Sequence, residues 1–246
     1  MPSEAKYSVD GFEAAAEVFA RRIDGEYHPE DIDEDALADL CYIDVTGSKY
    51  RFLKRAVDIF GAVAALAILL VPFLFVMLLI YVDDPGPVFF RQYRVGLHGK
   101  RFRLYKFRSM RINTPKYVST SELKDPDMFV TRVGRILRKL SIDELPQFIN
   151  VLFGDMSLVG PRPLISDEYE IHRMRMKYGV YNVRPGITGL AQINGRDTVS
   201  PVEKVHWDVK YLQQFGFMMD VKILLVTVPK VLGRSDVVEG CNSRKV

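Results

Sequence analysis

The sequence predicts an α+β fold that is mostly helical and is attached to a membrane by a re-entrant helix–break–helix hairpin. Residues 59–82 form an uncharged apolar run that contains Pro72 near its middle. Residues 88–110 hold two strand-like segments around a glycine-containing turn, which predicts a small β-hairpin. Later apolar residues recur at helical spacing, and the stretch 215–232 in particular predicts an interfacial amphipathic helix.

Residues 1–48 are interpreted as an acidic N-terminal extension. Residues 1–46 carry 13 Asp and Glu against 3 Lys and Arg, whereas the rest of the chain carries 31 basic and 18 acidic residues. Such a basic body favours an anionic partner: a phospholipid surface, a nucleotide or a nucleic acid. The two cysteines, Cys41 and Cys241, form neither a disulfide framework nor a metal-binding pattern, which fits a reducing compartment.

Residues 49–84 are predicted to form the membrane hairpin. The 24 residues of the apolar run would span roughly 36 Å as a helix, enough for a bilayer core of about 30 Å. Basic residues flank both ends, and the positive-inside rule keeps such flanks in the cytoplasm. Both flanks obey the rule only if the segment turns at Pro72, where a helix should kink or break. A single tilted crossing and a buried soluble helix are the alternatives.

Residues 85–246 are predicted to form a cytoplasmic domain that begins with the β-hairpin. Its strands are expected at Val88–Arg94 and Arg101–Met110. Basic side chains in the second strand would meet lipid headgroups close to the membrane. Lys106 and Arg108 could instead point at a substrate phosphate.

Two adjacent carboxylates, Asp143 and Glu144, stand out in the stretch 141–150. Ser141 followed by Glu144 is a capping-box pattern, which predicts a helix beginning at Ser141. Pro146 would cost that helix a hydrogen bond, so its start is expected to be irregular. Acids set among so many basic residues suit chemistry on a polyanion such as a nucleotide diphosphate, although an ordinary cap with solvated ion pairs would show the same pattern.

Three arginines follow in turn-forming segments. Residues 160–163 form a rigid Gly-Pro-Arg-Pro turn that presents Arg162, and arginine binds phosphate oxygens bidentately. Arg184 and Arg196 lie in a glycine-rich stretch that lacks the lysine and spacing of a P-loop. Residues 168–178 are read as a helix with a solvated, charged face. The stretch 215–232 suits a core helix as well as an interfacial one.

Five motifs now stand in a fixed order over about residues 50–235, and together they closely resemble the bacterial sugar transferase family. These are the monotopic polyprenyl-phosphate phosphoglycosyl transferases. The matching segments are Lys54–Asp58, Tyr105–Met110, Leu140–Gln147, Gly154–Pro163 and Val183–Gly189. Each motif alone is unspecific, but the ordered set is very specific.

The resemblance implies a reaction. A UDP-sugar would give its sugar-1-phosphate to undecaprenyl phosphate and release UMP, which is the first membrane step of cell-surface glycan assembly (exopolysaccharide, capsule, O-antigen or glycoprotein). Asp143 would be the nucleophile that forms an aspartyl phosphosugar, and Glu144 would hold Mg²⁺. Arg138, Arg162 and Arg196 match phosphate-binding positions, and Lys106 and Arg184 are further substrate-binding candidates.

The resemblance also implies the location and the partners. The protein would lie in the bacterial inner membrane, with its catalytic domain on the cytoplasmic face and with membrane lipids around the hairpin. No nucleic-acid partner is expected, because the chain has no helix-turn-helix or zinc-finger signature. A homodimer is compatible with the resemblance.

Two positions depart from the family's pattern. Val71 stands where many members have a serine before the membrane proline, and Leu190 stands where many have a tryptophan. They bear on the kink geometry and on substrate preference, not on the carboxylate pair. Two other functions stay open: hydrolysis of the nucleotide sugar, and a membrane-anchored scaffold in which the acids only cap a helix.

Overall fold

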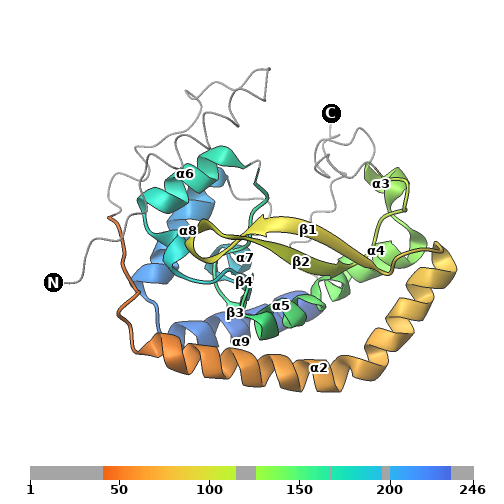
Figure 1. Ribbon diagram of the computed structural model, residues 1–246, viewed down its shortest axis with the longest axis horizontal. Coiled ribbons are helices and arrows are strands. Elements are labelled where there is room, and N and C mark those ends of the chain that lie inside the picture. The colour runs from red at the N-terminus through yellow and green to blue at the C-terminus, as the bar shows by residue number, and fades with distance from the viewer. Residues whose placement is uncertain (1–40, 115–125, 167, 196–199, 234–246) are drawn as a thin grey trace, which may run out of the picture. The chain divides into compact units, whose positions relative to one another are not determined.

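The computed structural model describes residues 41–114, 126–166, 168–195 and 200–233 (Figure 1). The chain divides into two units, 1–38 and 39–246, and all described residues belong to the second. Most of the predicted acidic extension therefore lies outside the described residues. The helices of the described part are α2 (Tyr50–Asp83), α3 (Pro126–Phe129), α4 (Arg132–Lys139), α5 (Gln147–Phe153), α6 (Tyr169–Lys177), α7 (Leu190–Ile193), α8 (Pro201–Gln213) and α9 (Phe217–Gly233).

The long apolar helix α2 runs without interruption through Pro72. Its 34 residues correspond to about 51 Å of helix, and by length and composition it could cross a membrane. Figure 1 shows that α2 changes direction part-way along its length. The helix therefore continues through Pro72 in place of the predicted helix–break–helix; loss of one backbone hydrogen bond at a proline can kink a helix without ending it.

Two small sheets lie on the side of α2 that faces the rest of the body (Figure 1). Strands β1 (Phe89–Val95) and β2 (Arg101–Phe107) pair antiparallel, with Phe89 opposite Phe107 and Val95 opposite Arg101, so the predicted hairpin is present. Strands β3 (Ser157–Val159) and β4 (Gly186–Thr188) pair in parallel. A Cβ on Gly186 would lie 2.1 Å from the backbone nitrogen of Gly160, so glycine is required where these two segments approach.

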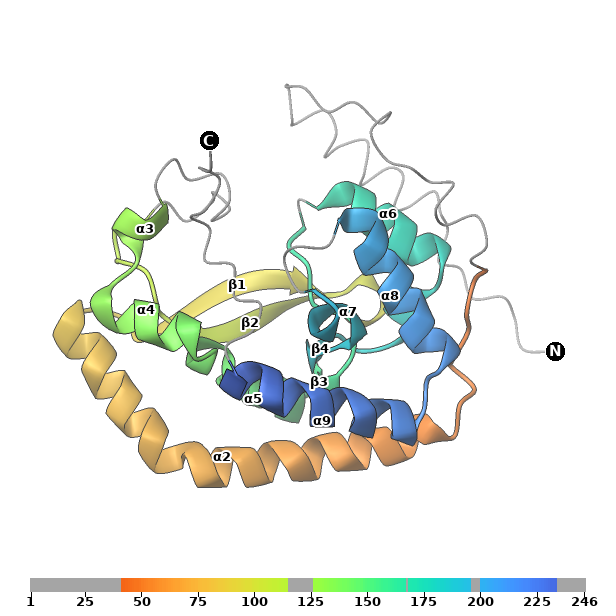
Figure 2. The ribbon, with the colours of Figure 1, turned by 180° about the vertical axis from the view of Figure 1, so that it is seen from behind.

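Both ends of α2 are bound to the same body. Near its start, Asp58 accepts hydrogen bonds from the Ser157 hydroxyl and the Leu158 N–H, each 2.9 Å long. At its far end, the Asp83 carboxylate accepts the Val133 N–H at 2.9 Å, and Asp84 pairs with Arg108 at 3.4 Å. Figure 2 shows the body from behind, lying along the length of α2.

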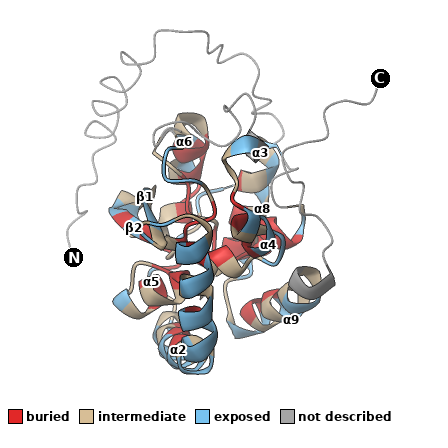
Figure 3. Ribbon diagram, turned by 90° about the vertical axis from the view of Figure 1, so that its right-hand side faces the viewer, coloured by how far each residue is buried: buried red, intermediate tan, exposed pale blue. Residues whose placement is uncertain are grey.

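A broad apolar surface runs along α2 and its neighbours. Phe60, Leu74 and other large apolar side chains of α2 are exposed, and much of the helix is coloured as exposed in Figure 3. Helix α9 has both of the predicted faces: Met219 and Ile223 are buried in the core, whereas Met218, Leu225 and Val228 are exposed. An exposed apolar surface of this kind marks a membrane or protein contact.

Candidate active site

The Asp143–Glu144 pair lies in a 3₁₀ turn, Ile142–Glu144, and the predicted capping box at Ser141 is wrong. Ser141 adopts a left-handed backbone conformation (φ 54°), and its side chain makes no capping hydrogen bond. Helix α5 begins only after Pro146. Proline lacks an N–H and is suited to the start of a helix, so it delays α5 and leaves the two acids in a separate turn.

Asp143 is buried, with 9% of its surface exposed, so it is not the solvated cap considered from the sequence. Within the described part of the chain, no hydrogen bond or ion pair holds its carboxylate. Burial raises the pKa of this carboxyl from 3.8 to about 6; the positive charge of Lys106 opposes the rise, and the negative charge of Glu144 adds to it.

Glu144 is held by two cations. Its Oε1 atom accepts a hydrogen bond from Lys106 Nζ at 2.7 Å and another from Arg162 Nη2 at 3.4 Å. Lys106 comes from β2, and Arg162 comes from the Gly-Pro-Arg-Pro turn. The two neighbouring acids therefore differ: Glu144 is fixed by charge pairs, whereas Asp143 keeps its carboxylate available.

Asn150 explains why β2 presents Lys106 to this turn. The Asn150 side chain accepts the Tyr105 N–H at 3.0 Å and donates to the Arg103 carbonyl at 2.6 Å. This fully buried amide binds α5 to the edge of β2, so the strand residue after Tyr105 faces the segment before α5.

Of the five predicted substrate-binding residues, the structure brings three to the carboxylates. Arg138 joins Lys106 and Arg162: its Nε donates to the Ser109 hydroxyl at 3.0 Å, and its charge lowers the pKa of Asp143. Arg196 lies outside the described residues.

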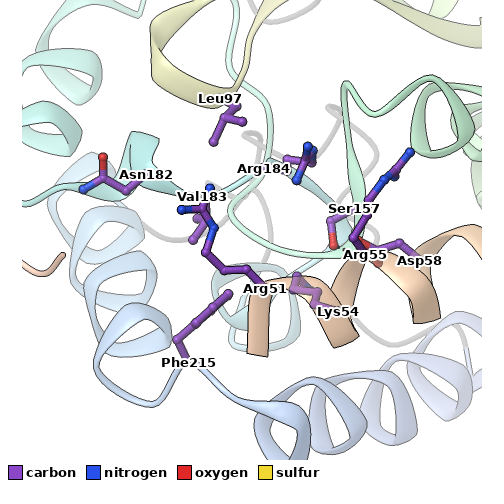
Figure 4. Close-up of a pocket in the computed structure, with 10 residues that line it drawn as sticks. All are labelled: Arg51, Lys54, Arg55, Asp58, Leu97, Ser157, Asn182, Val183, Arg184 and Phe215. Atoms are coloured by element: carbon purple, nitrogen blue, oxygen red, sulfur yellow. Dashed lines mark hydrogen bonds between the residues drawn. The ribbon is translucent and has the colours of Figure 1, made fainter. Parts of the chain in front are cut away.

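Arg184 lies in a different place. Its Nε donates to the Gly154 carbonyl at 2.8 Å, and its side chain lines a pocket with Arg51 and Arg55 near the start of α2 (Figure 4). Arg55 donates to the carbonyls of Val151 and Leu152 at the end of α5. Arg55 and Arg184 therefore satisfy backbone carbonyls where α5 ends, away from the carboxylate pair.

A buried ion pair that was not predicted from the sequence fixes the Arg162 turn. Arg175 of α6 pairs with Asp208 of α8 at 2.6 Å, and its Nη1 donates to the Arg162 carbonyl at 2.8 Å. The expected solvated face of residues 168–178 is wrong here, because Ile171 and Met174 pack into the interior. The spacing of these two apolar residues was the signal that Arg175 faces inward.

Arg94 of β1 was also missed. Burial, followed by repulsion from Arg162, lowers the pKa of its guanidinium to about 10. Its Nη2 donates to Gln92 at 2.7 Å, whereas its buried Nε has no hydrogen-bond partner in the described structure. An arginine on a short strand gives no sequence signal for such a position.

The residues at the pair fit a magnesium ion only if a substrate supplies further ligands. Among the described residues, no group of three or more His, Cys, Asp or Glu side chains could hold a metal. Mg²⁺ is commonly bound through one or two carboxylates, several waters and substrate phosphates. Asp143 and Glu144 match this smaller set, with Glu144 as the protein ligand expected from the sequence.

Comparison with known proteins agrees with these features. The family model described as "Bacterial sugar transferase" matches residues 49–234. The chain is 47% identical over 180 residues to "Uncharacterized sugar transferase EpsL" of Bacillus subtilis (strain 168), covering 73% of this chain and 87% of that protein. It is 39% identical over 193 residues to "Exopolysaccharide production protein ExoY" of Rhizobium meliloti (strain 1021), covering 72% and 84%.

A longer relative matches over part of its length. The "UDP-glucose:undecaprenyl-phosphate glucose-1-phosphate transferase" of Escherichia coli (strain K12) is 43% identical over 188 residues, which cover 73% of this chain and 40% of that protein. The chain thus spans less than half of that relative.

Proposed function

The chain belongs to the bacterial sugar transferase family, a family of phosphoglycosyl transferases, and we propose on this premise that it transfers a sugar-1-phosphate from a UDP-sugar to undecaprenyl phosphate and releases UMP. The relatives' names support the two substrates: one names UDP-glucose and undecaprenyl phosphate, and another names UDP-N-acetylgalactosamine and undecaprenyl phosphate. The name of a third relative supports a role in exopolysaccharide production.

The observation that supports the mechanism most directly is that the two acids differ in their contacts. Asp143 is buried without a direct partner among the described residues, whereas Glu144 is held by Lys106 and Arg162. A nucleophile must have a free lone pair, and a carboxylate whose pKa is about 6 is mostly ionised at neutral pH without an added base. This difference supports Asp143 as the nucleophile and Glu144 as the residue that positions charge.

In the first step, a carboxylate oxygen of Asp143 attacks the sugar-bound phosphorus of the donor. A new bond forms between that oxygen and phosphorus, the bond to the bridging oxygen breaks, and its electron pair leaves with UMP. Lys106, Arg138 and Arg162 surround the reacting phosphate with positive charge, which phosphoryl transfer mainly needs.

In the second step, a phosphate oxygen of undecaprenyl phosphate attacks the aspartyl phosphosugar. The bond between the Asp143 oxygen and phosphorus breaks, and the carboxylate regains its electron pair. Glu144 would hold Mg²⁺ together with the donor's phosphates. When bound, the ion neutralises charge on the diphosphate.

The hydrogen bonds at both ends of α2 support a re-entrant, monotopic attachment of the protein to the membrane. Both ends of α2 bind the same body, through Asp58 at one end and Asp83 at the other. A straight crossing would separate these ends by the bilayer core of about 30 Å and draw part of that polar body into lipid. We therefore place α2 in the cytoplasmic leaflet of the inner membrane, with the catalytic residues on the cytoplasmic face. A homodimer stays a prediction.

Two other functions compete with this one. A nucleotide-sugar hydrolase needs only that water replace the lipid acceptor in the second step. A membrane-anchored scaffold would leave Asp143 and Glu144 without a chemical role, but a buried carboxylate without a direct partner is costly to keep for a cap alone.

The test is UMP release by the full chain in lipid nanodiscs with Mg²⁺ and a panel of UDP-sugars, with and without undecaprenyl phosphate. Release that requires the lipid, together with a phosphosugar-linked lipid product, is the expected result. Equal release without the lipid would establish the hydrolase instead. No release from any UDP-sugar by folded protein would refute the proposed reaction.

A further inference from the structure

A cavity of about 190 Å³ adjoins the carboxylate site at Arg162. Arg162 lines this cavity and also bonds to Glu144, so the cavity and the acid pair share that side chain. By the volume of liquid water it has room for roughly six molecules, which suits part of a nucleotide sugar. Its polar and charged lining residues are Arg94, Arg162, Glu168, Arg175, Gln192 and Lys204.

The charges around the cavity favour an anion. The charge of Arg175 is neutralised by Asp208, which leaves Arg94, Arg162 and Lys204 facing a single lining carboxylate, Glu168. In the described structure, neither Arg94 nor Lys204 forms an ion pair. Arg94 and Arg162 also repel each other, and a bound anion would relieve that repulsion.

Two buried polar atoms in the walls have no hydrogen-bond partner among the described residues. One is Nε of Arg94, a donor; the other is Oε1 of Gln192, an acceptor on a side chain that is more than nine-tenths buried. The Gln192 amide nitrogen is already used, because it donates to the Ile187 carbonyl at 2.9 Å. A buried polar group without a partner is costly, so such groups indicate a missing ligand or water.

We propose that this cavity binds the leaving half of the donor, a nucleoside monophosphate, and that Arg94 is a ligand of its phosphate. The inference rests on the proposed phosphoglycosyl transfer and adds the site of the leaving group. Gln192 Oε1 accepts an N–H group of the base, and Glu168 accepts a ribose hydroxyl.

The direction of the reaction supports this placement. In phosphoryl transfer the attacking and leaving oxygens lie roughly in line on opposite sides of phosphorus. Asp143 attacks from one side, and Arg162 both contacts Glu144 and lines the cavity. On this proposal the leaving oxygen lies on the side of the cavity, where the leaving phosphate gains one negative charge near Arg94.

The test measures UMP binding directly, independent of turnover. The full chain in nanodiscs is titrated with UMP by calorimetry, as wild type, Arg94→Gln and Arg94→Lys. Arg91→Gln is the matched control, because Arg91 is an exposed arginine on the same strand and does not line the cavity. Thermal unfolding of each variant shows whether it is folded.

We expect Arg94→Gln to weaken UMP binding at least tenfold, Arg94→Lys to restore part of it, and Arg91→Gln to leave it unchanged. The Michaelis constant for the UDP-sugar should rise with Arg94→Gln, while that for undecaprenyl phosphate should not. Unchanged UMP binding by folded Arg94→Gln would overturn the inference and leave the transferase reaction standing. UMP binding that depends on Arg94 in a protein without turnover would instead refute the reaction and keep the nucleotide site.

Discussion

Replacing Asp143 by asparagine should abolish activity and at the same time stabilise the protein. The ionised carboxylate is buried at neutral pH without a direct partner among the described residues, which is why its pKa rises from 3.8 to about 6. One pKa unit corresponds to 1.36 kcal/mol, so ionisation of Asp143 costs the folded state about 3 kcal/mol at pH 8. A neutral amide of the same shape avoids this cost.

The pH dependence of the stability difference tests the same effect independently. Because the folded-state pKa is above the unfolded value, the wild type is stabilised by protonation as the pH falls through 6 towards 3.8. The advantage of Asp143→Asn should thus be largest at pH 8 and should fall to roughly half of that by pH 5. At pH 8 it corresponds to an increase of roughly 6–12 °C in the melting temperature.

The assay is thermal unfolding of the full chain in nanodiscs at pH 8 and pH 5, beside UMP release. Asp44→Asn is the control, because Asp44 is exposed and its pKa is lowered by hydrogen bonds from Thr46, so its replacement should not stabilise. Turnover should fall at least about 10³-fold in Asp143→Asn. A mutant that melts at or below the wild-type temperature at pH 8 would show that the carboxylate is satisfied, and the assignment of Asp143 as a free nucleophile would fail.

Three further outcomes follow from the same contacts. The value of kcat/KM should fall about tenfold per pH unit below pH 6, because Asp143 must be ionised to attack; a profile that stays flat down to pH 4 would contradict its raised pKa. Glu144→Gln should raise the Mg²⁺ concentration for half-maximal rate at least about tenfold, and an unchanged titration would remove Glu144 as the metal ligand. Asp208→Asn should lower the unfolding free energy by about 3–5 kcal/mol, because it removes the ion-pair partner of buried Arg175. It should also raise the Michaelis constant for the donor, because Arg175 would no longer hold the Arg162 turn. An unaltered melting temperature would contradict this role of the ion pair.

The local sequence pattern predicted the secondary-structure elements, which depend on residues that are neighbours in sequence. Alternation and turn residues predicted the hairpin of β1 and β2, and length without charge predicted the apolar helix α2. The capping box predicted at the carboxylate pair is absent, because Pro146 and the backbone conformation of Ser141 override a side-chain pattern.

The charge environment of each side chain depends on contacts between segments that are distant in sequence, so it could not be predicted from the sequence. Arg162 and Arg184 look alike in sequence, each set among glycine and proline, yet Arg162 bonds to Glu144 and Arg184 bonds to the Gly154 carbonyl. Arg94, whose buried Nε has no hydrogen-bond partner in the described part of the chain, carried no sequence signal.

The sequence by itself determined which chemical groups the protein has: a pair of adjacent acids, a surplus of basic residues and an apolar helix long enough for a bilayer. The tertiary structure decided which acid is paired and which has no direct partner among the described residues, because Lys106 on β2 and Arg162 on its turn both contact Glu144. Burial then set the pKa of Asp143. Burial and pairing are properties of the packed chain, since they arise from residues that are far apart in sequence and close in space.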